Sequence, residues 1–138
     1  MSSLQTEKGT LTISDNIFFV VELEVKRGQV DDLESVARDM VSVARKDEPG
    51  TLNYEYFLSD DRTTCHIYER YVNPEALLRH GLTGSDELNK RGQAFRPVRL
   101  TVYGKVTEEV REKRIEPLLK AVPGFKVVNM EPISRLMR

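Results

Sequence analysis

The amino-acid sequence predicts an α+β fold of the split βαβ type, in which helices cover a four-stranded antiparallel sheet. Two observations predict it. Segments in which apolar residues alternate, as in strands, are interleaved with segments in which they recur every three or four residues, as in helices. Their order over residues 17–106 is strand, helix, strand, strand, helix, strand. We expect a flexible tail at residues 1–15, one domain at residues 16–106, and a C-terminal helix and strand extension at residues 107–138 packed on that domain.

The first strand and the first helix have the clearest faces. Residues 17–25 alternate so that one face is wholly apolar and consists of Ile17, Phe19, Val21, Leu23 and Val25. A helix is predicted from Asp31 to about Lys46, with an apolar stripe made of Leu33, Val36, Ala37, Met40 and Ala44. Acidic residues begin this helix and basic residues end it, as the helix dipole favours.

The middle of the chain predicts a hairpin that leads into a second helix. Residues 51–58 and 63–71 are the two strands, and residues 59–62 form the turn between them. Asn73 suits a helix N-cap and Pro74 suits the first helical turn, so a helix is predicted directly after the second of these strands. Its inward face carries Ala76, Leu77 and His80, and it ends at Gly81 and Gly84.

Three further elements complete the predicted fold. A helix restarts at residues 85–87, aligns Leu88, Gly92 and Phe95, and stops at Pro97, after which alternation predicts a strand from Val98 to Val106. Thr107 caps a helix that continues to about Val122 and is kinked or restarted at Pro117. Its inward residues are predicted to be Val110, Leu118, Leu119 and Val122, and a short strand from Phe125 to Met130 follows.

The composition excludes several classes of function. The chain has 21 basic and 22 acidic residues and a formal charge of −1. It therefore lacks the positive electrostatic field that would hold nucleic acid or an anionic membrane surface. Cys65 is the only cysteine, which excludes an intramolecular disulfide and a thiolate-rich zinc site. The longest apolar run, Ile17 to Val21, is too short to span a bilayer, and the first ten residues lack the pattern of an export signal. We expect a cytoplasmic protein with a small-molecule or protein partner.

Bulky residues on both faces of the predicted sheet indicate a partner. Phe18 and Val20 lie opposite Phe19 and Val21 on the first strand, while helices cover only one face. A large uncovered apolar face usually marks an interface. We therefore predict a homodimer that pairs sheet against sheet. The alternative is a monomer whose C-terminal helix and fifth strand fold back over the open face.

His80 is the first candidate for chemistry, because imidazole exchanges protons near neutral pH. It lies on the inward face of a helix that directly follows a strand, so it can point between helix and sheet. An equal alternative is a structural histidine that bonds a backbone carbonyl near the helix end. The other histidine, His66, falls on the face assigned to the dimer and is interpreted as an interface residue.

Glu69 and Tyr71 share the strand face that leads to His80. The carboxylate could orient or charge the imidazole, and the phenol could hold a substrate oxygen. The alternative for Glu69 is a cross-strand ion pair with an arginine or a lysine. No phosphate-binding Gly-rich loop, nucleophile elbow or metal-ligand spacing occurs in the sequence. We therefore predict neither a cofactor nor a bound metal.

Three segments together resemble the antibiotic biosynthesis monooxygenase family: the strand and helix from Ile67 to His80, Val25-Lys26-Arg27-Gly28, and Asp47-Glu48-Pro49-Gly50. The resemblance extends from about Ile17 to Val106 and implies a ferredoxin-like domain that pairs as a dimeric α/β barrel. Enzymes of this family typically oxidise phenolic or quinol-type substrates with molecular oxygen, using neither metal nor flavin. By this resemblance the catalytic residues are His80, Tyr71 and Glu69, and the substrate-binding residues are Phe19, Val21, Tyr54, Leu77 and Phe95.

Departures from the relatives narrow this prediction. Haem-degrading members look to carry an asparagine, a tryptophan and a histidine where this chain has approximately Val21, Tyr71 and Gly92, and this chain has no tryptophan. Haem degradation is therefore not expected. Many relatives carry a second aromatic residue or histidine shortly after the helix that bears His80. In this chain that place is occupied by residues 83–86, which include neither type. The sequence predicts a cofactor-independent monooxygenase of a small aromatic, phenolic or quinol-type substrate. The alternative is a non-catalytic small-molecule binding or dimeric interaction module with the same fold.

Overall fold

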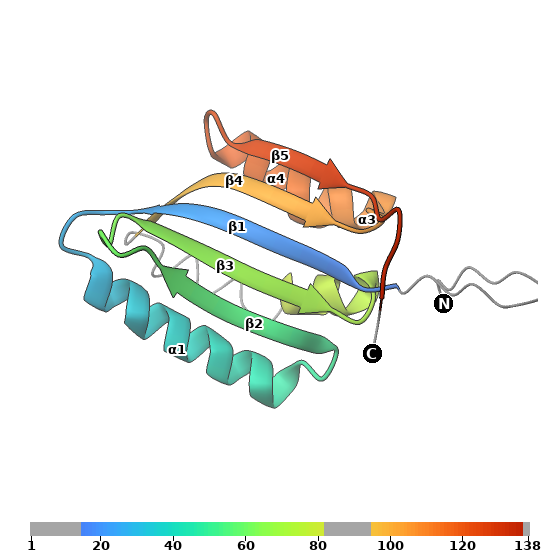
Figure 1. Ribbon diagram of the computed structural model, residues 1–138, viewed down its shortest axis with the longest axis horizontal. Coiled ribbons are helices and arrows are strands. Elements are labelled where there is room, and N and C mark those ends of the chain that lie inside the picture. The colour runs from blue at the N-terminus through green and yellow to red at the C-terminus, as the bar shows by residue number, and fades with distance from the viewer. Residues whose placement is uncertain (1–14, 82–94, 137–138) are drawn as a thin grey trace, which may run out of the picture.

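The computed structural model describes residues 15–81 and 95–136 of the chain. Its centre is a five-stranded sheet with the strand order β2-β3-β1-β4-β5 (Figure 1). Neighbouring strands are antiparallel except β4 and β5, which are parallel. The predicted α+β, split βαβ fold is confirmed, but the count of four strands is wrong because the C-terminal strand joins the sheet. The strands are β1 (Ile17–Val25), β2 (Thr51–Leu58), β3 (Thr64–Tyr71), β4 (Phe95–Tyr103) and β5 (Lys126–Met130).

Helices cover one face of this sheet. The helical segments are α1 (Val30–Asp47), residues 74–81, α3 (Glu108–Val110), the π-helical turn η2 (Arg111–Ile115) and α4 (Glu116–Ala121). One core cluster joins α1 to Leu23, and a second joins residues 74–81 and the C-terminal helices to Ile17 and Phe19. Both clusters lie on the same side of the sheet, because these three residues alternate with outward residues along β1. The side of β1 that carries Phe18 and Val20 remains the open face.

The fourth strand begins earlier than the sequence predicts. The expected helix through Phe95 with a stop at Pro97 is wrong at this end, because Phe95 begins β4 and Pro97 lies inside it. The proline is tolerated because a bulge at Val98, where the pairing with β1 shifts register between Glu22 and Leu23, disrupts the ladder next to Pro97, and β5 pairs with β4 only from Arg99 onward. The predicted helix restart at residues 85–87, with Leu88 and Gly92, lies outside the described residues.

The C-terminal extension forms a helical run that returns the chain to the sheet. Thr107 caps it as predicted, since its Oγ1 accepts a hydrogen bond from the Val110 amide at 3.1 Å. Pro117 lies in the first turn of α4, where the helix restarts. The prediction that Leu119 points inward is wrong: it is 46% exposed, whereas Ile115 is buried. The physical reason is η2, whose wider turn rotates the residues that follow it relative to an ideal α-helix.

Candidate functional site

The helix at residues 74–81 carries His80 back toward the sheet. Asn73 caps this helix through a hydrogen bond that its Oδ1 accepts from the Ala76 amide at 2.9 Å. The helix packs closely against the turn that follows α1, because Gly50 has no side chain there. A Cβ on Gly50 would lie 2.6 Å from the Ala76 Cβ. This close approach brings the end of α1 to His80.

Glu48, at the C-cap of α1, is the nearest partner of His80. The His80 Nδ1 lies 2.7 Å from the Glu48 Oε1, and the Thr51 hydroxyl donates to the same oxygen at 2.9 Å. Glu48 is 3% exposed and His80 is 5% exposed. The partner of this imidazole nitrogen is therefore a carboxylate, and not the backbone carbonyl of the structural alternative. Such a charge-assisted bond fixes the position of the ring.

Sequence reasoning missed Glu48 as a site residue. A signal was present: an acidic side chain at the C-terminal end of a helix opposes the helix dipole, and Pro49-Gly50 follows it directly. A glutamate at such an unfavourable place needs a partner elsewhere in the fold.

The second carboxylate of the site, Glu69, lies on the other side of the imidazole. Its Oε1 is 3.5 Å from the His80 Nε2, and it accepts a short hydrogen bond from the Tyr71 hydroxyl. Glu69 is 4% exposed and Tyr71 is fully buried. Glu69 thus faces the histidine and a phenol within the helix-covered core. The three residues predicted to be catalytic are brought into one cluster, and their catalytic roles remain a prediction.

Two tyrosines of β2 complete the polar cluster. The Tyr54 ring meets the His80 ring edge-on, with ring centres 4.7 Å apart, and the Tyr54 and Tyr56 hydroxyls are 2.8 Å apart. Burial, and then the neighbouring Tyr56, raise the pKa of Tyr54. Burial and the Glu69 charge likewise raise the pKa of Tyr71. These phenols therefore stay neutral at physiological pH and act as hydrogen-bond donors.

The remaining predicted site residues form the apolar surroundings. Phe19 packs against Tyr71 with ring centres 6.5 Å apart, and Leu77, one turn before His80, is fully buried. Val21 contacts both core clusters, and Phe95 belongs to the cluster beneath α1 that also contacts Tyr54. These positions lie on the helix-covered side, while direct contact of Val21 or Phe95 with a substrate remains a prediction.

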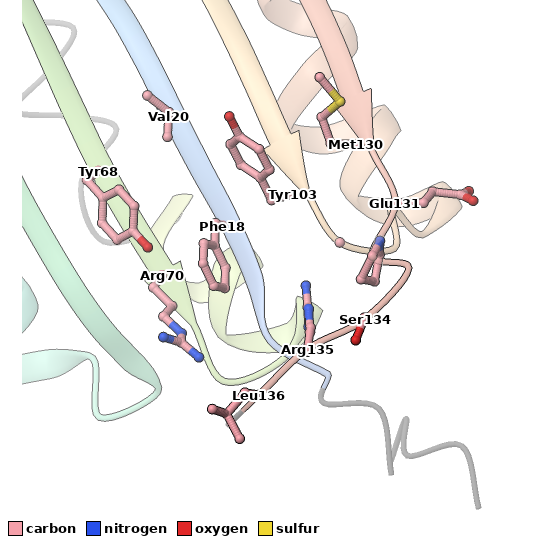
Figure 2. A pocket seen from close by; sticks show the side chains of 12 residues that line it. Phe18, Val20, Tyr68, Arg70, Tyr103, Met130, Glu131, Ser134, Arg135 and Leu136 are labelled. Atoms are coloured by element: carbon pink, nitrogen blue, oxygen red, sulfur yellow. The ribbon is translucent and has the colours of Figure 1, made fainter. Parts of the chain in front are cut away.

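The open face presents a different set of side chains. Figure 2 shows Phe18, Tyr68 and Tyr103 from three neighbouring strands around a cavity of about 520 Å³. Residues 130–132 and 134–136 line its other side. The Arg70 and Arg135 guanidinium carbons lie 4.5 and 5.6 Å from the Phe18 ring centre. Burial, and then the Arg70 charge, lower the pKa of Arg135.

His66 also lies on the open face, as predicted. Its side chain is 48% exposed, and its Nε2 is 3.7 Å from the Glu22 Oε1. This solvated pair offers no enclosed site.

Within residues 15–81 and 95–136, no group of three or more His, Cys, Asp or Glu side chains has an arrangement that could hold a metal ion. No helix in those ranges has both the length and the apolar character needed to cross a bilayer.

The fold and the cluster define a small split βαβ domain with a buried carboxylate–histidine–tyrosine site. Residues 16–85, just over half of the chain, match the family antibiotic biosynthesis monooxygenase, and the chain belongs to that family. No curated protein matches it.

Solved structures support the same fold. MupZ from Pseudomonas fluorescens is 20% identical with a TM-score of 0.70, over 89% of this chain and 94% of its own. A candidate antibiotic biosynthesis monooxygenase from Caulobacter crescentus CB15 is 23% identical with a TM-score of 0.60, over 68% and 92%. SnoaB, a cofactor-independent oxygenase from Streptomyces nogalater, is 13% identical with a TM-score of 0.57, over 68% and 96%.

Proposed function

We propose that the protein is a cofactor-independent monooxygenase that oxidises a small aromatic, phenolic or quinol-type substrate with molecular oxygen. The observation that carries the proposal is a buried imidazole held between two carboxylates and next to two phenols. Family membership and the fold shared with SnoaB, a cofactor-independent oxygenase, support the same class of reaction.

His80 is the proton-handling group in this proposal. Glu48 holds Nδ1, so Nε2 is the nitrogen that we assign to the substrate proton. Glu69, 3.5 Å from Nε2, stabilises the imidazolium that forms when a phenolic proton arrives. The Tyr54 phenol, which can accept a hydrogen bond from Tyr56, remains protonated and donates to an oxyanion that develops on the substrate. Tyr71 keeps its hydrogen bond to Glu69 and positions that carboxylate. The apolar surroundings, with Phe19 and Leu77, exclude water from the reacting pair.

The proposed reaction is balanced in atoms and electrons without a bound redox cofactor. Loss of the phenolic proton makes the ring electron-rich enough to pass an electron to oxygen, and the resulting radicals recombine on a ring carbon. Loss of the hydrogen on that carbon and cleavage of the O–O bond then give a quinone and one water. The substrate supplies all four electrons that the oxygen molecule takes up: one oxygen atom enters the quinone and the other leaves as water.

The open face is the proposed homodimer interface. Phe18 and Val20, which are only partly buried in the protomer, lie on it with Tyr68 and Tyr103. Aromatic side chains accompanied by arginines, as Phe18 is by Arg70 and Arg135, are typical of protein interfaces. The helices of the extension pack on the other side, against Ile17 and Phe19. We propose that the dimer works in the cytoplasm, with the small-molecule substrate and oxygen as its other partners.

Oxygen consumption tests the proposed function. Hydroquinones, anthrones and flavonols are offered to wild-type protein, His80→Ala and His66→Ala, and oxygen uptake is followed with an electrode. We expect uptake by wild type and His66→Ala, and a loss of at least about 100-fold in His80→Ala because a general base contributes this much. Glu48→Gln tests the positioning role by lowering kcat more than it changes KM.

The alternative is a non-catalytic binding or interaction module. It is favoured by one observation: among the described residues, every buried side-chain nitrogen or oxygen has a hydrogen-bond partner, as in a structural cluster. Ligand binding without any His80-dependent oxygen uptake would overturn the enzymatic proposal in favour of this alternative.

A further inference from the structure

Arg114 of the C-terminal extension reaches the edge of the His80 site. Its Nη1 donates a hydrogen bond to the Leu77 carbonyl at 2.9 Å, one turn before His80. Its guanidinium carbon lies 5.8 Å from the centre of the Phe19 ring, and that ring packs against Tyr71. The extension therefore supplies a cation to a site whose other polar side chains come from residues 48–80.

The path of this side chain depends on Gly81. A Cβ at position 81 would lie 2.7 Å from the Arg114 Cδ and 3.0 Å from its Nη1. The arginine thus occupies the space that a side chain at the end of the helix would need. Arg114 also lies in η2, and π-helical turns occur often at functional sites.

Arg114 differs from the neighbouring basic residues in its ionic contacts. Arg111 pairs with Glu108 and Glu116, and Lys113 pairs with Glu109, all on the exposed side of the helical run. Within the described ranges Arg114 has no carboxylate partner, and it is only partly exposed. Its charge acts on the Tyr71 phenol, where it opposes the effects of burial and Glu69 on the pKa.

We propose that Arg114 is a specificity-determining residue that holds a carboxylate or phenolate oxygen of an anionic aromatic substrate beside Tyr71. A guanidinium donates two parallel hydrogen bonds to such a group, and its planar fork suits a carboxylate better than lysine does. The proposal rests on the proposed function for the location of the substrate, and it adds the charge that the substrate carries.

A matched pair of probes tests this inference through binding. Hydroquinone and 2,5-dihydroxybenzoate differ only in a carboxylate, and their dissociation constants are measured by calorimetry for wild type and variants. We expect wild type to bind the carboxylate probe about tenfold more tightly, the gain of one charge-assisted contact. Arg114→Met abolishes this preference, Arg114→Lys keeps part of it, and the neighbouring Lys113→Met leaves it unchanged.

Gly81→Ala provides a second variant that keeps the arginine. The new methyl group displaces the flexible end of Arg114, so the preference for the carboxylate probe falls while the melting temperature changes little. The inference is wrong if wild type binds both probes equally, if it does not bind the carboxylate probe at millimolar concentration, or if Arg114→Met keeps the preference.

The two proposals fail in different measurements. An Arg114-dependent preference without oxygen uptake refutes the monooxygenase and leaves the anion site. His80-dependent uptake with an equal kcat/KM for both probes refutes the anion site and leaves the monooxygenase.

Discussion

The two faces of the sheet each bring a histidine close to a glutamate, with opposite results. On the helix-covered face, His80 is 5% exposed and lies 2.7 Å from Glu48. On the open face, His66 has a side chain 48% exposed and lies 3.7 Å from Glu22. The same pair of residue types forms a tightly held cluster in one place and a solvated contact in the other.

This difference teaches that burial, and not residue type, decides which histidine a carboxylate holds in place. In water, an ion pair gains little because solvent screens the charges and both side chains lose conformational freedom. Under the helices, each polar group must find a partner, so Glu48, Glu69 and Tyr71 hold the His80 ring from two sides.

Removing the buried carboxylate should have the largest effect. Glu48→Ala leaves His80 and Thr51 without their shared acceptor inside the core, and we expect a loss of about 3 kcal/mol in the free energy of unfolding. Glu22→Ala on the open face should cost less than about 1 kcal/mol. Urea denaturation of both variants measures the contrast, and equal losses would contradict the distinction between the faces.

A charge at the centre of the open face should break the proposed dimer. Val20→Asp places a carboxylate in the interface, and we expect the dissociation constant to rise by about 100-fold or more, because an unpaired buried charge costs several kcal/mol. Sedimentation velocity at several concentrations measures it. Leu119→Asp, on exposed α4, is the matched control and should remain dimeric. A wild-type monomer at all concentrations would refute the homodimer.

Tyr71→Phe should weaken the covered face by about 1 kcal/mol at neutral pH, because Glu69 loses a hydrogen bond. It should also reduce alkaline destabilisation. The folded-state pKa of Tyr71 is raised above its ordinary value of 10.0, so its contribution to stability is present below pH 10 and is lost as the pH rises above 10. Denaturation from pH 9 to pH 11 should show a shallower decline than in wild type. Val110→Ala, which only removes buried methyl groups, should keep the wild-type slope.

His66→Ala should have the smallest effect. Its contact with Glu22 is long and solvated, so the free energy of unfolding should change by less than about 0.5 kcal/mol. Thermal unfolding checks this value. A loss comparable to that of Glu48→Ala would mean that the open-face pair is more strongly coupled than its geometry indicates.

Local patterns account for most of the predicted fold. Alternation along residues 17–25 predicted which side chains of β1 face the helices, and Ile17, Phe19, Leu23 and Val25 are indeed buried. The capping role of Asn73 and the helix restart at Pro117 could also be predicted from the sequence, because a cap and a proline act on their nearest neighbours. The start of β4 at Phe95 could not be predicted in this way, since the bulge at Val98, next to Pro97, depends on the pairing with β1. Leu119 was misplaced because a π-helical turn breaks the periodicity on which the prediction relied.

The sequence by itself determined the order of the elements, the two faces of each strand and the placement of Glu69 and Tyr71 on one face of β3. These properties follow from backbone periodicity over a few residues. Only the tertiary structure decided that Glu48 meets His80 and that Arg114 passes Gly81 to reach Phe19. Those contacts join residues more than thirty positions apart, and their partners depend on how closely the helices pack on the sheet, for which local patterns carry no signal.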